Sequence, residues 1–296
     1  MKFLVTGGAG YIGSHMVNLL LKKNFDVVVL DNLSTGHEYN IQDCEHLNID
    51  LVDAENLSKN LNKRKFDGVF HFAGKSIASE SIINPNLYYL NNITGTKNLL
   101  KVMLDNDLNN LIFSSSAAVY GKSELDFITE NVNKAPINPY GKSKLQAEKD
   151  INETSERYGL NSISLRYFNA CGADPDGKFG EDHACETHLI PNILQSLLDP
   201  KEEFYVYGNN YPTKDGTCIR DYVHVSDIVD THYLAFKNFG VSRMQQAYNI
   251  GIGKGFSVLE IIKACEKATK VKIDIKFKDK REGDPISLVA DNKSIL

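Results

Sequence analysis

A tyrosine and a lysine one helical turn apart lie in the stretch INPYGKSKLQAEKD, residues 137–150. Residues i and i+4 of a helix share a face, so Tyr140 and Lys144 can act on the same ligand. A free phenol has a pKa of about 10 and is a poor base at neutral pH, but a nearby ammonium group favours the phenolate. The spacing therefore suggests proton transfer by Tyr140, although the same pair also occurs by chance on many helices.

Three serines end the apolar run that precedes this helix, in FSSSAAVYG. The hydroxyl groups of Ser114, Ser115 and Ser116 can hydrogen-bond an alcohol or carbonyl oxygen held beside the tyrosine. Serines at strand ends also commonly cap the backbone. If a dinucleotide binds nearby, the set of hydroxyl, phenol and ammonium groups indicates hydride transfer coupled to proton transfer.

The N-terminal segment has the pattern of a dinucleotide site. The apolar run KFLVTG, the glycine turn TGGAGYIG, a helical segment and the second apolar run DVVVLDN predict strand, helix and strand. Glycines at 7, 10 and 13 let the backbone approach a pyrophosphate at the positive end of the helix. Asp31, which ends the second run, can bind ribose hydroxyls and repels a 2′-phosphate. The cofactor predicted from these residues is NAD.

The alternation of strands and helices continues along the chain. Apolar runs at 66–74, 109–121 and 161–172 predict strands, and helical patterns at 84–106 and 139–159 separate them. This alternation predicts an α/β fold with a Rossmann-type, doubly wound parallel sheet. We also expect the strand-end residues Phe72, Ala73 and Gly74 to leave room for a cofactor.

The amino-acid composition of the sequence changes after Cys171. Segments 172–188 and 207–222 are rich in Gly, Asp, Pro and Asn and predict long loops that cover a site. Short predicted elements follow at 189–198, 225–239, 247–251, 257–269 and 272–278. We predict a Rossmann domain at 1–170 with a returning segment at about 220–250, and a smaller α/β substrate-binding domain at 171–296.

Composition argues against several classes of protein. The 296 residues carry a formal net charge of −5 and show no Lys/Arg cluster that would bind nucleic acid or an anionic membrane. No apolar run approaches the ~20 residues that span a bilayer, and the N-terminal run meets glycines too early for a signal peptide. Five scattered cysteines without a CxxC pair predict a reducing, cytoplasmic location.

Taken together, the motifs resemble the extended short-chain dehydrogenase/reductase family. Matching segments run from residue 4 to residue 284 and include VTGGAGYIGSH, FHFAGKSIASES, FSSSAAVYG, NPYGKSKLQAE, LRYFNACGADP and DGTCIRDYVHVSDI. Within the family they are most similar to epimerases of UDP-hexoses. The resemblance implies tightly held NAD and interconversion of UDP-galactose and UDP-glucose, in galactose metabolism, through a 4-keto intermediate.

The resemblance also implies a role for individual residues. Ser116 would hydrogen-bond the sugar, Tyr140 would be the base, and Lys144 would hold the ribose and tune the tyrosine. A homodimer is implied, paired through the helices that hold Asn91 and Tyr140. The implied NAD contacts are Gly7, Gly10, Tyr11, Ile12, Gly13, Asp31, Asn32, Asp50, Leu51, Phe72, Ala73, Gly74, Asn91, Tyr140, Lys144 and Phe168. The implied UDP-sugar contacts are Ser116, Tyr140, Asn169, His188, Arg220, Arg281, Asp284 and Leu288.

Several positions depart from the family pattern. His188 stands where asparagine is common near the diphosphate. Leu288 is intermediate between the bulky and the small residues that distinguish enzymes for plain and N-acetylated sugars, so that choice stays open. Although His183, Cys185 and His188 lie in one loop, we expect no metal site there. The chain ends at Leu296, earlier than is usual in the family, and the second domain is expected to be short at its C-terminus.

Two other functions fit parts of the pattern. A 4,6-dehydratase or decarboxylase of the same family would require an acid after the strand serines, where this chain has Ala117 and Ala118. A non-catalytic NAD-sensing scaffold would be expected to have lost the tyrosine or the lysine. The retained Ser116, Tyr140 and Lys144 favour the epimerase.

Overall fold

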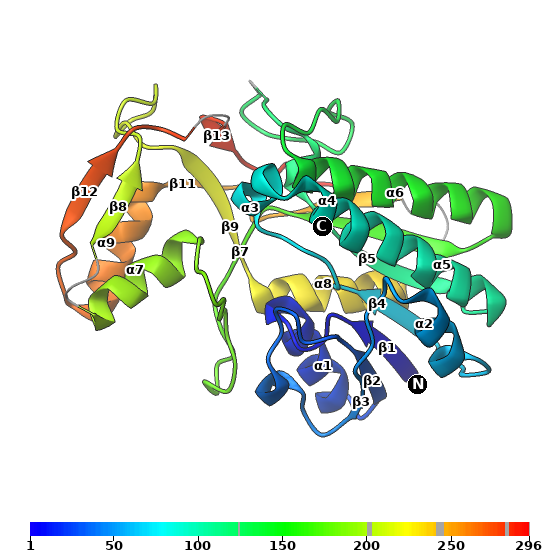
Figure 1. The fold of residues 1–296 in the computed structure, drawn as a ribbon. Helices are drawn as coiled ribbons and strands as arrows, with labels where there is room; N and C mark the ends of the chain where they lie inside the picture. Colours follow the sequence, from blue (N-terminus) through cyan, green and yellow to red (C-terminus); the bar gives the residue numbers. More distant parts are fainter. Residues whose placement is uncertain (124, 200–202, 241–245, 282–283, 296) are drawn as a thin grey trace.

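The computed structural model describes residues 1–123, 125–199, 203–240, 246–281 and 284–295. Within these ranges the largest sheet has seven strands, all parallel, in the order β10-β6-β5-β4-β1-β2-β3 (Figure 1). The order reverses between β1 and β4, where open α/β sheets bind ligands at their carboxyl ends. The strands are β1 Lys2–Thr6, β2 Asp26–Leu30, β3 Glu45–Leu47, β4 Gly68–His71, β5 Asn110–Ser116, β6 Asn161–Tyr167 and β10 Ala247–Ile250.

Helices cover both faces of this sheet. Phe3 and Val5 of β1 join a buried cluster with α1 and α8, whereas Leu4 joins one with α2, α5 and α6. Because both faces are buried, the strands are nearly continuous apolar runs. The predicted doubly wound, Rossmann-type fold is confirmed. The covering helices are α1 Tyr11–Lys22, α2 Ala54–Leu61, α5 Gly95–Asp105, α6 Pro139–Tyr158 and α8 Val225–Lys237.

The strand predicted at 161–172 is two strands. β6 stays in the main sheet, the chain turns away at Phe168, and β7, Asn169–Cys171, pairs with β9 of a smaller sheet. A continuous apolar run does not reveal that its two ends join different sheets. The short strand β3 was not predicted, because three residues show no clear period.

The helix predicted at 84–106 is also divided. It consists of α4, Pro85–Tyr88, a π-helical segment η2, Tyr89–Thr94, and then α5. Such π-helical segments often mark functional sites. Here the segment carries Asn91 and Asn92, and Asn92 holds the backbone N–H and C=O of Lys75 at 2.8 and 2.9 Å.

Two smaller sheets lie beside the main one (Figure 1). The loop prediction for 207–222 is wrong at its end, because Ile219 begins strand β9. Asp221 made this strand look like a polar loop in the sequence. In the structure its carboxylate is fully buried and accepts the N–H groups of Ile252 and Gly253. The remaining elements are α3 Ala78–Ile83, α7 Leu189–Leu198, α9 Val258–Thr269, β8 Phe204–Tyr207, β9 Ile219–His224, β11 Gly255–Ser257, β12 Ile275–Lys278, β13 Ser287–Leu288 and the 3-10 turns η1 Glu38–Asn40 and η3 Ala117–Val119.

Part of the segment at about 220–250 packs on the main sheet, whereas its first residues belong to β9 of a smaller sheet. α8 packs on the main sheet and β10 extends its edge beside β6. The boundary between two domains near residue 170 stays a prediction. No helix in the described part of the chain is long and apolar enough to cross a membrane.

A buried ion pair fixes α6 to the sheet. Arg166 of β6 donates to both carboxylate oxygens of Glu148, at 2.8 and 2.6 Å, and the two side chains are 5% and 3% exposed. Ser115 of β5 also donates to Glu148, and Arg166 donates to the Tyr120 hydroxyl group at 2.9 Å. Because Glu148 lies one turn after Lys144, this network sets the position of the helix that carries Tyr140.

Removing one partner of this pair should destabilise the protein strongly. For Arg166→Met we expect the free energy of unfolding to fall by about 3–5 kcal/mol, because the Glu148 carboxylate is left buried without a countercharge. The double variant Arg166→Met/Glu148→Leu should lose clearly less. Urea denaturation followed by circular dichroism measures both, and equal losses would show that the charge pairing is not the cause.

Candidate active site

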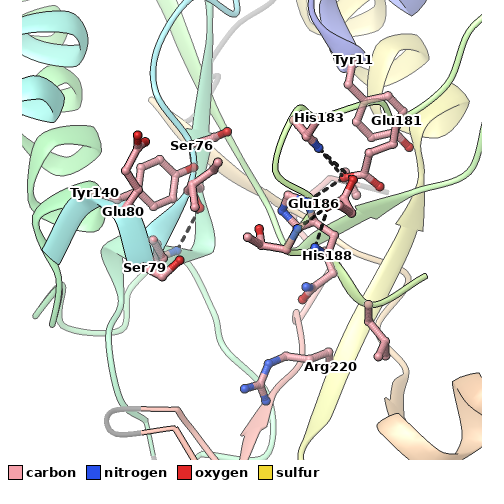
Figure 2. Close-up of a pocket in the computed structure, with 18 of the residues that line it drawn as sticks. Tyr11, Ser76, Ser79, Glu80, Tyr140, Glu181, His183, Glu186, His188 and Arg220 are labelled. Atoms are coloured by element: carbon pink, nitrogen blue, oxygen red, sulfur yellow. Dashed lines mark hydrogen bonds and ion pairs between the residues drawn. The ribbon is translucent and has the colours of Figure 1, made fainter. Parts of the chain in front are cut away.

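A long cleft lies along the carboxyl edge of the main sheet. Two adjoining pockets share Gly7, Gly10, Phe72 and Gly74 and so form one continuous space. Every residue that the sequence predicted to contact a cofactor or substrate lines this space. Figure 2 shows Tyr140 on one side of it and the cluster of Glu181, His183, Glu186 and His188 on the other.

The glycine turn leaves room for a ligand at the start of α1. Gly7 has φ of +73°, and a Cβ atom there would lie 2.5 Å from the Ala73 nitrogen, so the turn packs directly on the end of β4. A Cβ atom at Gly13 would lie 2.0 Å from the Gly7 carbonyl oxygen. At Gly10, by contrast, the nearest atom would be 3.4 Å away, and the missing side chain leaves space in the cleft. The helix N-terminus, with its positive dipole, therefore faces the cavity.

Asp31 is held at the end of β2 by backbone amides. Its two carboxylate oxygens accept the N–H groups of Ala9 at 3.0 Å and Leu33 at 2.8 Å. Farther along the cleft, Asn32 donates to Asp50 at 2.9 Å, and Leu51 lies next to them. This part of the cleft therefore offers carboxylate and amide groups of the kind that bind ribose and adenine.

Local sequence explains why Tyr140 lies at the start of α6. The Asn138 side chain caps the helix by accepting the N–H of Gly141 at 2.8 Å, and Pro139 occupies the first turn. A Cβ atom at Gly141 would lie 2.4 Å from the Ala118 carbonyl oxygen. The glycine after the tyrosine therefore permits close packing of α6 on the end of β5.

The three strand-end serines have separate roles. Ser114 shares a hydrogen bond with the Tyr167 hydroxyl group, and Ser115 donates to Glu148 at 2.5 Å. Ser116 accepts the N–H of Ala118 at 3.1 Å and is also hydrogen-bonded to Tyr140. Ser116 therefore caps the turn after β5 and is the one serine of the three that meets the tyrosine, while its role toward a substrate stays a prediction.

Lys144 lies beneath the site and is 4% exposed. Its ammonium group donates to the Ser114 carbonyl oxygen at 2.9 Å and lies 5.0 Å from the centre of the Phe113 ring. Burial lowers the pKa of Lys144 to about 8, although Glu148 acts in the opposite direction. The lysine nevertheless remains mostly a cation at neutral pH.

The protein's own groups keep Tyr140 protonated. Burial raises the pKa of Tyr140 and outweighs the hydrogen bond with Ser116, which lowers it. From the sequence we expected Lys144 and the positive ring of the predicted NAD together to favour the phenolate. In the structure the cost of burying a phenolate prevails, so a base at this position needs further positive charge from a ligand.

The far wall of the cleft carries two arginines. Arg220 of β9 donates to the Pro285 carbonyl oxygen at 3.0 Å and lies 3.9 Å from the Asp284 carboxylate. The Arg281 guanidinium group stacks 4.1 Å from the centre of the Tyr207 ring. These permanent cations fit a diphosphate.

One part of the cleft lies between β5 and β13, where Ser116 and Leu288 line it. Phe168 is buried in one cluster with Ala117, and Leu288 packs against that cluster. Asn169, the next residue after Phe168, begins β7 and also lines the cleft.

Residues 181–188 form a polar cluster that we did not fully anticipate. His188 lies 2.8 Å from Glu181 and 3.1 Å from Glu186. Burial alone would lower the pKa of His188, but these two carboxylates raise it to about 10. We had singled out His188 but neither glutamate. The alternation of acidic residues and histidines at 181, 183, 186 and 188 is the signal that could have revealed them.

Comparisons with known proteins agree with this geometry. The chain is similar to the UDP-glucose 4-epimerase of Halalkalibacterium halodurans, with 45% identity over 293 residues that cover 99% of this chain and 88% of that protein. The crystal structure of UDP-glucose 4-epimerase from Brucella ovis in complex with NAD matches with a TM-score of 0.94 and 41% identity, over 98% of this chain and 90% of that one. The crystal structure of UDP-glucose 4-epimerase from Bifidobacterium longum in complex with NAD+ and UDP matches with a TM-score of 0.92 and 36% identity, over 99% of this chain and 91% of that one.

The pattern of the NAD dependent epimerase/dehydratase family matches residues 3–251, from β1 to just beyond β10. This range includes the glycine turn, the strand serines and the start of α6. The similarity to the three epimerases extends through the remainder of the chain. The chain therefore belongs to the NAD dependent epimerase/dehydratase family.

Proposed function

We propose that this protein interconverts UDP-galactose and UDP-glucose by inverting C4 of the sugar, with NAD as its cofactor. The observation that carries the proposal is the hydrogen-bonded pair of Ser116 and Tyr140, with buried Lys144 one turn away, facing a cleft that also holds the glycine turn and Arg220. The similar proteins from Halalkalibacterium halodurans, Brucella ovis and Bifidobacterium longum bear the name of this activity.

The residues of the cleft fit NAD. The open space at Gly10, the free start of α1 and the fixed carboxylate of Asp31 match its pyrophosphate and a ribose without a 2′-phosphate. Gly74 has φ of +153°, and a Cβ atom there would lie 2.8 Å from the Asn92 side chain, so the end of β4 has no room for a side chain. Bound there, NAD would supply the hydride acceptor, and in the return step the hydride donor, for C4 of the sugar.

Tyr140 moves the proton that accompanies this hydride. As the C4–H bond breaks, the phenolate of Tyr140 takes the proton of the O4 hydroxyl group, and the carbinol becomes a ketone. Ser116, hydrogen-bonded to Tyr140, is placed to bind the same oxygen. In the reverse direction Tyr140 gives the proton back to O4. The positive charge of Lys144, together with a cationic ligand, offsets the cost of the buried phenolate.

Inversion requires the 4-keto sugar to turn while the nucleotide stays bound. Arg220 is well suited as an anchor, because hydrogen bonds to the Ile219 and Pro285 carbonyl oxygens fix its guanidinium group. Arg281, stacked on Tyr207, supplies a second cation on the same wall. With the diphosphate held there, rotation about its bonds presents either face of the sugar to Tyr140.

The same geometry argues against a dehydratase. Expulsion of the C6 hydroxyl group requires an acid after the strand serines, but Ala117 and Ala118 form the turn η3 there. The nearby carboxylate of Glu80 lines the cleft but accepts a hydrogen bond from Tyr88 at 2.6 Å.

We also propose a cytoplasmic location. All five cysteines lie in the described ranges and are free, as expected in a reducing compartment.

Pairing into a homodimer is proposed through the helices that hold Asn91 and Tyr140. Ile82 and Ile83 of α3 and Leu90 of η2 are 66%, 78% and 46% exposed beside these helices, which favours an apolar contact there. Light scattering after size-exclusion chromatography should give twice the chain mass of 33.1 kDa. A mass of one chain at assay concentration would contradict the dimer.

The activity itself is tested with purified protein and UDP-galactose. We expect UDP-glucose to form without any net consumption of NAD, because the hydride is returned in each cycle. Absence of UDP-glucose with NAD supplied, in protein shown to be folded by circular dichroism, would rule the proposal out.

The role of Tyr140 is tested by Tyr140→Phe. We expect this variant to keep its fold and its NAD affinity, while turnover falls by about 10²–10⁴-fold through loss of the proton acceptor. Tyr158→Phe is the matched control, since Tyr158 ends the same helix and is 64% exposed. Wild-type turnover in Tyr140→Phe would exclude this tyrosine as the base.

A further inference from the structure

Four ligand-type side chains converge in the loop between β7 and α7. The cluster consists of Glu181, His183, Glu186 and His188, and one nitrogen or oxygen atom from each lies within 4.8 Å of all the others. Figure 2 shows these side chains pointing toward one another on the wall of the cleft opposite Tyr140. None of the four has a place in the proton and hydride transfers proposed above.

The spacing of the atoms matches a coordination shell. His188 Nδ1 lies 2.8 Å from Glu181 Oε1 and 3.1 Å from Glu186 Oε1. His183 Nδ1 lies 3.1 Å from Glu186 Oε2 and 3.8 Å from Glu181 Oε1. A tetrahedral ion with ligands at about 2.0–2.1 Å holds neighbouring ligand atoms roughly 3.4 Å apart. Three of the measured distances are shorter than that value and one is longer, and Glu186 faces the two histidines through different oxygens.

Hydrogen bonds account for part of this arrangement, since Glu186 also accepts the N–H groups of Thr187 and His188, each at 2.7 Å. Each Nδ1 atom carries at most one hydrogen, yet each faces oxygens of both carboxylates. The glutamate side chains are only 8% and 3% exposed, and two neighbouring buried carboxylates repel each other unless positive charge, from a protonated histidine or a bound cation, lies between them. A cation at the centre would satisfy all four atoms at once.

We propose that Glu181, His183, Glu186 and His188 bind a divalent transition-metal ion of the zinc class. Two imidazoles and two carboxylates suit Zn²⁺, whereas Mg²⁺ and Ca²⁺ prefer shells made of oxygen alone. Four protein ligands form a closed site, which is typical of structural rather than catalytic zinc. From sequence alone we expected no metal here, because His183, Cys185 and His188 lie in a loop rather than in a recognisable metal-binding motif.

The bound ion would stabilise the loop that forms this wall of the cleft. The loop leaves β7 at Cys171 and ends at His188, the residue before α7. Near its beginning the Gly172 carbonyl oxygen accepts a hydrogen bond from Tyr11 at 2.6 Å, so the loop is already tied to the glycine turn. A metal at 181–188 fixes its other end. This proposal is independent of the reaction that the protein catalyses.

Zinc binding to the purified full-length chain tests the site. After treatment with a chelator and its removal, titration with ZnCl₂ in a calorimeter should show one ion per chain, and zinc should raise the melting temperature. Co²⁺ in place of zinc should give the visible absorption of a tetrahedral site. Failure of both ions to bind would overturn the proposal.

Single substitutions test the ligand set. His183→Ala and Glu181→Gln should each weaken zinc binding by more than ~100-fold. Removing a residue that only hydrogen-bonds a metal ligand already lowers metal affinity by about 10–100-fold, and losing a ligand should cost more. Cys185→Ser is the matched control, because this exposed cysteine lies in the same loop but outside the cluster. Circular dichroism verifies the fold of each variant. Unchanged zinc affinity in His183→Ala, or an equal loss of zinc affinity in Cys185→Ser, would show that the ligands have been assigned to the wrong residues.

Discussion

The close packing of α6 on the end of β5 is the constraint on which the site depends. Gly141 allows the helix to approach the Ala118 carbonyl oxygen, and the buried pair of Glu148 and Arg166 fixes the helix one turn beyond Lys144. These contacts bring the phenol of Tyr140 to the Ser116 hydroxyl group. A shift of α6 along its axis would separate the two groups, because one residue of helix rises by about 1.5 Å.

The protonation of Tyr140 depends on whether a charged ligand is bound beside it. Burial raises the pKa of Tyr140 and lowers that of Lys144, so in the protein alone the tyrosine stays protonated while the lysine remains mostly a cation. A cationic ligand bound in the cleft would change this balance, since an opposite charge within a few ångströms favours the phenolate. In the proposed reaction the base is therefore strongest when the cofactor is in place to receive a hydride.

The parts of the structure that sequence could predict are those fixed by local pattern. The spacing of apolar residues and of glycines was enough to predict β1, the turn after it and α6. Every predicted site residue lines the cleft. The turn of the chain at Phe168 and the strand around Asp221 depend on pairing between distant segments, which local period does not encode. Glu181 and Glu186 were missed for a related reason, because acidic residues in a loop look like solvated surface until the fold buries them.

The loop at 172–188 shows how a wall of the cleft can be built without an apolar core. Between Gly172 and His188 the only large hydrophobic side chain is Phe179, which packs edge-on against His15. A segment so poor in apolar contacts gains little from burial and needs polar interactions to define its shape. The Tyr11 hydrogen bond at one end and the cluster of two glutamates and two histidines at the other provide them. Because Tyr11 and His188 both line the cleft, the interactions that order this loop also determine the width of the space opposite Tyr140.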